Sequence, residues 1–131
     1  MNRMDPSFTH EFLGRFNSFN DAVVRRIEHR YDASGGQRTT LTISTQDMEA
    51  DAGWCNVIVV IDKVSEMAFR EGLSTRRVLS DGLTIAWLNG KVWCDLSPYA
   101  SDPVTADDFR RSDFYVVGES FAWRAEQFGE G

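Results

Sequence analysis

The sequence predicts a mainly β domain of the α+β class: an antiparallel β-sandwich or a strongly curved sheet of about six to seven strands, with a short N-terminal helix. Three observations support this prediction. One amphipathic helical pattern lies near the N-terminus, and alternating runs rich in Val, Ile and Thr fill most of the remaining chain. Two of those runs flank an Asn-Gly dipeptide, the strongest local signal for a β-hairpin.

Length and composition indicate a single domain that spans residues 1–131. The chain is 42% hydrophobic and 26% charged, as ordinary globular proteins are. We expect flexible ends at about residues 1–6 and 126–131. The longest apolar stretch, residues 57–61, is too short to cross a bilayer, and the polar N-terminus lacks the apolar core of a secretory signal. These features favour a cytoplasmic protein without membrane contact.

The first expected element is the helix. Ser7 or Asp5 is available as its N-cap, and the turn-forming residues 17–21 end it. Its apolar stripe, with the spacing i, i+4, i+5 and i+8, consists of Phe8, Phe12, Leu13 and Phe16.

Two strands joined by a turn are expected next. The first spans about residues 22–31 and carries Val23, Ile27 and Tyr31 on one face. Residues 32–36 then form a turn, and residues 39–45 return as a Thr-rich strand.

Residues 54–64 are the most β-prone segment. They are apolar on both faces, so we expect a central strand that is covered on both sides. The strand can continue through residues 65–69 if a bulge near Asp62 and Lys63 changes the alternation. Residues 77–79 form a short strand or a turn.

Residues 83–88 and 91–96 flank Asn89-Gly90 and form the predicted hairpin. A two-residue turn places Trp87 opposite Val92 and Ala86 opposite Trp93. One face of the hairpin is therefore core and includes Cys94, whereas Trp93 and Asp95 lie on the other face.

A last strand is expected from about residue 114 to residue 123, after a turn whose residues 105–108 resemble a capping box with Asp in place of Glu. Gly118 permits close packing or a bend. One face of this strand carries Tyr115, Val117, Glu119, Phe121 and Trp123.

The residue types that carry chemistry are sparse. His10 and His29 lack partners at metal-ligand spacing, and the two cysteines, Cys55 and Cys94, each stand alone. No nucleophile elbow or phosphate-binding glycine loop occurs. We therefore expect no enzyme activity, no cofactor and no metal, and two free, buried thiols; a disulfide between two strands is the alternative.

Two further features leave alternatives open. Asp95 and Glu119 come together if their strands are neighbours; otherwise each pairs with an arginine or faces solvent. Trp93 lines a second core under the helix, or it lies on an exposed apolar patch of the kind that marks binding surfaces. The candidate interaction or ligand surface consists of Trp93, Asp95, Tyr115, Glu119, Phe121 and Trp123.

The net charge of −6 argues against nucleic-acid binding and suits a partner with a basic surface. A homodimer formed through surface aromatics is compatible with this interpretation. The chain also holds one basic cluster, which we interpret as a solvated strand face: Arg25, Arg26, His29 and Arg30, with Arg38 across a turn.

Several short motifs resemble those of small, mostly uncharacterised bacterial β-rich proteins, some relatives of which are grouped with immunity proteins of polymorphic toxin systems. Asn20 stands where that pattern has a histidine. The resemblance implies a β-rich architecture and neither catalytic residues nor a cofactor. Its motifs are residues 19–22, the strand 54–64, residues 78–82, Asp95, residues 112–117 and residues 121–123.

Together these features predict a non-enzymatic protein-interaction module, such as a toxin-neutralising immunity-type protein. It would cover a basic partner surface with an acidic rim and an aromatic patch. The alternative is a small-ligand-binding β domain whose pocket is lined by Trp93, Tyr115, Phe121 or Trp123.

Overall fold

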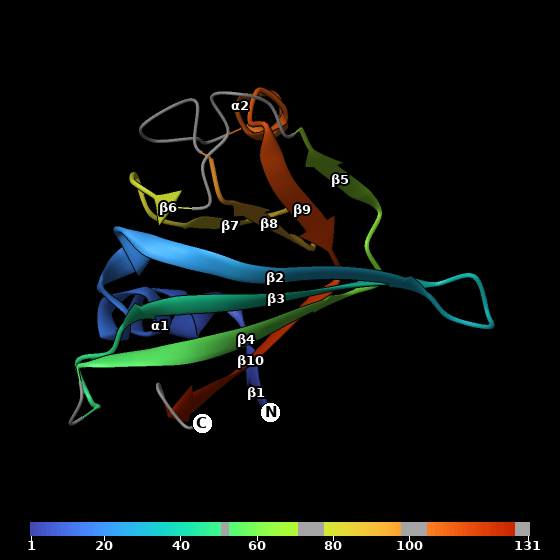
Figure 1. The fold of residues 1–131 in the computed structure, drawn as a ribbon. Helices are drawn as coiled ribbons and strands as arrows, with labels where there is room; N and C mark the ends of the chain where they lie inside the picture. The colour runs from blue at the N-terminus through green and yellow to red at the C-terminus, as the bar shows by residue number, and fades with distance from the viewer. Residues whose placement is uncertain (51–52, 71–77, 98–104, 128–131) are drawn as a thin grey trace.

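Two antiparallel sheets pack against each other in the computed structural model, which describes residues 1–50, 53–70, 78–97 and 105–127 (Figure 1). The larger sheet has the order β1-β10-β4-β3-β2-β6 and the smaller sheet the order β5-β9-β8-β7. The predicted α+β sandwich, mainly of β-strands, is confirmed. The larger sheet contains β1 (Asn2–Met4), β2 (Ala22–Tyr31), β3 (Gln37–Gln46), β4 (Trp54–Asp62), β6 (Val78–Leu79) and β10 (Ser120–Gln127). The smaller sheet contains β5 (Glu66–Phe69), β7 (Thr84–Leu88), β8 (Lys91–Asp95) and β9 (Phe114–Gly118).

The N-terminal helix forms where its apolar stripe predicts it. A 3₁₀ turn, η1 (Pro6–Phe8), leads into α1 (Thr9–Arg15) and is capped by the Asp5 carboxylate, which accepts the Ser7 backbone N–H at 2.8 Å. A second 3₁₀ turn, η2 (Asn17–Phe19), follows, and the positive φ angles of its three residues end the helical path. The second helix, α2 (Ala106–Arg110), begins with the predicted capping box of Thr105 and Asp108.

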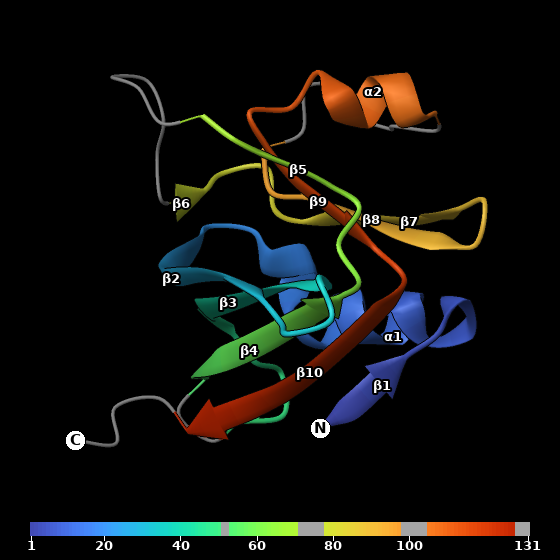
Figure 2. The ribbon, with the colours of Figure 1, turned by 90° about the vertical axis from the view of Figure 1, so that its right-hand side faces the viewer.

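The main core lies between the two sheets and is closed on one side by α1. The Phe12 ring of α1 lies 5.5 Å from the Phe121 ring and 5.1 Å from the Trp123 ring, both on β10. A second, smaller core lies on the opposite side of the smaller sheet, beneath α2 (Figure 2). It consists of Trp93, Phe109, Tyr115 and Val117.

The Asn-Gly hairpin forms with the predicted register. Trp87 pairs with Val92 and Ala86 with Trp93. Asn89 and Gly90 have φ angles of 53° and 76°, because a type I′ turn needs positive φ at both positions. Cys94 is buried on the core face, as expected.

The prediction of one last strand over residues 114–123 is wrong. Its residues form β9 in the smaller sheet and β10 in the larger sheet, with a corner at Gly118 and Glu119. A Cβ atom on Gly118 would lie 2.5 Å from Ile61 Cγ2 and 2.6 Å from the Asp62 carbonyl oxygen, so only glycine fits there. The expected bend at Gly118 is present. The bend divides the predicted face, because Tyr115 and Val117 lie in the second core whereas Phe121 lies in the main core.

A second corner changes the prediction for residues 54–69. β4 ends at Asp62, and Lys63 has a φ of 51°. Because β5 continues in the other sheet, the chain crosses from the larger to the smaller sheet where a bulge was expected. The two corners are hydrogen-bonded to each other. The Glu119 N–H donates to the Asp62 carbonyl at 3.0 Å, and the Ser65 N–H donates to the Val117 carbonyl at 2.9 Å.

Three smaller expectations also need correction. A register shift between Val24 and Arg26 puts Val24, not Val23, on the face that carries Ile27. β4 is central as predicted, but neither helix nor any other described element covers its outer face. Residues 2–4, expected within a flexible end, pair with β10 as β1. With β1, β5 and the divided last strand, the described residues form ten strands rather than six or seven.

Candidate interaction site

The six residues of the predicted surface fall in separate places. Trp93, Asp95 and Tyr115 lie on the outer side of the smaller sheet, beneath α2. Phe121 is fully buried in the main core. Glu119 is exposed at the corner, and Trp123 lies half-buried beside α1. The residues therefore form no single patch.

Trp93 belongs to the second core, one of the two expected alternatives, but the covering helix is α2 rather than the N-terminal helix. Trp93 is 6% exposed, and its indole stacks at 6.3 Å on the Tyr115 ring and lies 5.6 Å from the Phe109 ring of α2. The Arg110 guanidinium lies 5.4 Å from the Trp93 ring centroid. These contacts hold α2 on the sheet.

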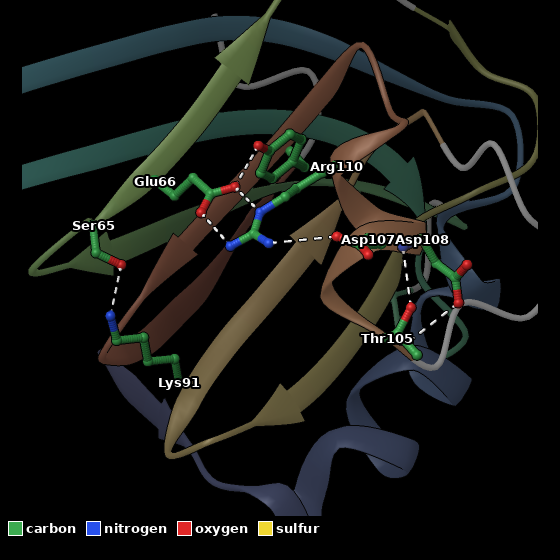
Figure 3. Close-up of polar contacts among 8 residues, drawn as sticks. Ser65, Glu66, Lys91, Thr105, Asp107, Asp108 and Arg110 are labelled. Atoms are coloured by element: carbon green, nitrogen blue, oxygen red, sulfur yellow. Dashed lines mark hydrogen bonds and ion pairs between the residues drawn. The ribbon is translucent and has the colours of Figure 1, made fainter.

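A polar cluster at Glu66 completes this attachment (Figure 3). Arg110 donates from Nε and Nη2 to the two Glu66 carboxylate oxygens at 2.8 and 3.0 Å, and the Tyr115 hydroxyl donates to Glu66 at 2.6 Å. The hydrogen bond from Arg110 is the main reason that the pKa of Glu66 is lowered. Desolvation, together with the bond to Glu66, raises the pKa of Tyr115 to about 12.

Asp95 and Glu119 do not meet. Asp95 pairs with Tyr115 in the sheet and is fully buried, whereas Glu119 follows Gly118, which pairs with Val92 at the far end of β8. Asp95 Oδ1 accepts the Ser97 N–H at 3.0 Å, and burial raises the pKa of Asp95. Among the described residues its Oδ2 has no hydrogen-bond partner. Glu119 instead lies 3.7 Å from Lys63 Nζ at the surface.

Trp123 borders a groove between α1, β1 and β10 that we call the α1 groove. Its ring lies 5.5 Å from Phe16 and 5.5 Å from the Arg15 guanidinium. Phe8, 53% exposed, adds a second aromatic ring to the groove. The hollow has a volume of about 330 Å³ and is lined by Asn2, Arg3, Met4, Phe8, Glu11, Phe12, Arg15, Glu49 and Trp123.

The α1 groove is lined by two acidic residues, Glu11 and Glu49, and two basic residues, Arg3 and Arg15. Arg15 lies within it, but its Nε is 2.9 Å from Asp47 and 3.0 Å from Glu49, so two carboxylates neutralise its charge. The hydrogen bond from Arg15 lowers the pKa of Asp47. Glu11 is exposed and Glu49 has a 67% exposed side chain. Beyond the Arg15–Glu49 pair, a second hollow of about 260 Å³ is lined by Asp47, Ala50, Trp54, Cys55, Ala125, Glu126 and Gln127 as well as those two residues.

The chemistry-bearing residues occupy ordinary structural positions. Both cysteines are free and buried, and desolvation raises the pKa of Cys55 to about 12 and that of Cys94 further, so both thiols are protonated at neutral pH. The His29 ring bonds to Thr39 Oγ1 at 2.7 Å and Gln37 Oε1 at 2.9 Å. Within the described parts of the chain, no group of three or more His, Cys, Asp or Glu residues could hold a metal ion.

Sequence reasoning missed most of the α1 groove. It named Trp123 but not Phe8, Glu11, Arg15 or Glu49. Phe8 was counted in the buried helical stripe, although it lies at the N-cap of α1, where its ring leaves that stripe. No local sequence pattern indicates that β1 and Glu49, which are far apart in the sequence, both lie beside α1.

Comparison with known proteins adds no relative: no family model, curated protein or solved structure matches the chain. No helix among the described residues is long and apolar enough to cross a membrane.

Proposed function

We propose that this chain is a protein-interaction module that binds a basic segment of a partner protein in the α1 groove. One observation carries the proposal: an exposed Phe8 and a half-buried Trp123 line a hollow whose rim bears the carboxylates of Glu11 and Glu49. Exposed aromatic rings beside charged groups are typical of protein interfaces.

The chemistry of the α1 groove suits a lysine or arginine side chain. A cation over the face of an indole or phenyl ring is attracted by the ring quadrupole, by about 0.5–1 kcal/mol at exposed sites. Glu11 adds a carboxylate acceptor beside those rings. Arg15 does not repel such a cation strongly, because Asp47 and Glu49 already pair with it. The second hollow extends the acidic path along the partner segment.

A toxin-neutralising role would use this groove to cover a basic surface of the toxin, and the net charge of −6 would favour fast association. The small-ligand alternative has less support. Of its four expected lining residues, Trp93, Tyr115 and Phe121 are buried in the two cores, which leaves only Trp123. We therefore favour the partner protein over the small ligand.

The test is a calorimetric titration with poly-L-lysine as a basic polypeptide probe. Phe8→Ala and Glu11→Gln should each weaken binding by roughly two- to five-fold, the range of exposed charge and cation–π contacts. Tyr31→Ala is the matched aromatic control, because Tyr31 is 73% exposed and does not line the α1 groove. Asp81→Asn is the matched charge control at an exposed site outside the groove.

The control variants decide between the groove and general attraction to an acidic protein. If Phe8→Ala and Glu11→Gln weaken binding while Tyr31→Ala and Asp81→Asn bind like the unmodified chain, the α1 groove is the site; if Phe8→Ala and Glu11→Gln bind normally, the proposal fails. If Asp81→Asn weakens binding as much as Glu11→Gln, the attraction is diffuse and the proposal fails. Thermal melts of all four variants check that the fold is intact.

A further inference from the structure

The outer face of the larger sheet, turned away from α1 and the smaller sheet, gathers arginines. Val57, Val59 and Ile61 of β4 lie in the main core, so the alternate residues of β4 and their cross-strand partners lie on the outer face. Arg26, Thr42, Ile58 and Arg124 align across four strands, as do Arg30, Arg38, Asp62 and Ser120. We call this surface the arginine face; its charged residues are Arg3, Arg25, Arg26, Glu28, Arg30, Arg38, Asp62, Arg124 and Glu126.

The arginine face has the opposite sign to the whole chain. It holds six of the 14 Lys and Arg residues and three of the 20 Asp and Glu residues. Its formal charge is therefore +3 on a chain whose net charge is −6. Such separation leaves a positive potential over one sheet face, which favours an anionic partner there.

The guanidinium groups retain donors for a partner. Glu28 is shared between Arg30 at 2.6 Å and Arg26 at 3.2 Å, so one carboxylate serves two arginines. Arg25 bonds to the Ser44 hydroxyl at 3.0 Å. Arg38 donates two hydrogen bonds to Asp62 at 2.6 and 3.1 Å, and Arg124 lies 2.9 Å from Glu126. Each guanidinium has five N–H donors, so these contacts use only part of the capacity. The side chains of Arg26, Arg30, Arg38 and Arg124 are 54–75% exposed.

The centre of the arginine face is small and apolar. Thr40, Val60 and Ala122 align between the charged rows and are half-buried. No described element covers them, because α1 packs on the inner side and α2 on the smaller sheet (Figures 1 and 2). A shallow hollow of about 580 Å³ opens at one end, lined by Arg3, Asp32, Arg38, Asp62, Lys63, Glu119, Ser120 and Ala122.

We propose that the arginine face docks an acidic surface of a partner protein, separately from the basic segment in the α1 groove. Guanidinium forks match carboxylates in bidentate geometry, and the Thr, Val and Ala centre offers apolar contact that a protein surface can use. A nucleic acid fits less well. The central row of Thr40, Val60 and Ala122 has no aromatic ring on which a base could stack.

The test is a titration with poly-L-glutamate, an acidic polypeptide, beside a DNA duplex at the same salt concentration. Arg26→Gln and Arg124→Gln should each weaken poly-L-glutamate binding by roughly two- to five-fold, and added salt should weaken it further. Lys91→Gln is the matched control, because it removes the same charge from the smaller sheet. It should bind like the unmodified chain.

Three results would overturn the proposal: no binding of poly-L-glutamate, an equal loss in Lys91→Gln, or tighter binding of the duplex than of poly-L-glutamate. The outcome is independent of the α1 groove. Phe8→Ala and Glu11→Gln should leave poly-L-glutamate binding unchanged, so failure at one surface is distinguishable from failure at the other.

Discussion

Gly118→Ala tests the corner that carries the chain from the smaller to the larger sheet. The new methyl group would lie 2.5 Å from Ile61 Cγ2 and 2.6 Å from the Asp62 carbonyl oxygen, whereas ordinary contact begins at 3.4 Å. These atoms must therefore move by about 0.9 and 0.8 Å. Ile61 is fully buried and the Asp62 carbonyl accepts the Glu119 N–H, so neither can move freely.

The size of the effect follows from two opposing contributions. Overpacking a well-packed site costs about 1–3 kcal/mol. Replacing glycine by alanine restricts the unfolded chain and returns about 0.4–1 kcal/mol. We expect a net loss of about 1–2 kcal/mol in the free energy of unfolding, which for a domain of this size lowers Tm by roughly 4–8 °C.

Urea denaturation followed by tryptophan fluorescence measures this loss. Gly14→Ala is the control, because Gly14 lies in α1 and, apart from its chain neighbours and the helix backbone, no described atom lies within 4 Å of the added Cβ. It should raise the free energy of unfolding by about 0.5–1 kcal/mol, as helical Gly-to-Ala changes do. If Gly118→Ala is as stable as the unmodified chain, the two sheets do not pack at this corner as described.

Three further substitutions test the surroundings of α2. Asp95→Asn should raise the free energy of unfolding by about 1 kcal/mol at pH 7, because it removes a buried carboxylate whose Oδ2 has no hydrogen-bond partner in the described part of the chain. The pKa of Asp95 is raised in the folded state, so protonation of this group stabilises the unmodified chain as pH falls. The difference in the free energy of unfolding between Asp95→Asn and the unmodified chain should therefore shrink in acid. A constant difference across the pH range would contradict this. Tyr115→Phe removes the hydrogen bond to Glu66 and should cost about 1–2 kcal/mol in urea titrations. Thr105→Ala removes the N-cap of α2 and should lower the free energy of unfolding by about 1 kcal/mol. An unchanged free energy of unfolding would show that Thr105 does not cap α2 in solution.

The predictable parts of the fold are local. Asn89-Gly90 determines the hairpin register within a few residues, because two consecutive positive φ angles are costly for most other residues. The capping box at Thr105 and the helical stripe at Phe12 are likewise properties of short segments. The two sheet crossings were not predictable in this way. Gly118 indicated a bend, but only its contacts with Ile61 and Asp62 show that the chain changes sheets there.

The candidate site depends on contacts between distant segments. Trp123 and β1 come from opposite ends of the chain. Arg15 pairs with Asp47 although β2 and β3 lie between them in the sequence. An alternating pattern indicates which residues share a face of a strand but not which sheet the strand joins. The same limit explains why Trp93, Tyr115 and Trp123 were placed on one surface although they belong to different parts of the fold.

The measurement that most directly tests the proposed function follows the indole N–H signals in a ¹H–¹⁵N spectrum during titration with poly-L-lysine, with Trp123→Phe and Trp93→Phe used to assign them. The Trp123 indole lines the α1 groove, whereas Trp93 is buried beneath α2. A basic segment in the groove predicts a saturable shift of the Trp123 signal while the Trp93 signal stays in place. An unchanged Trp123 signal at saturating poly-L-lysine would contradict the proposed function.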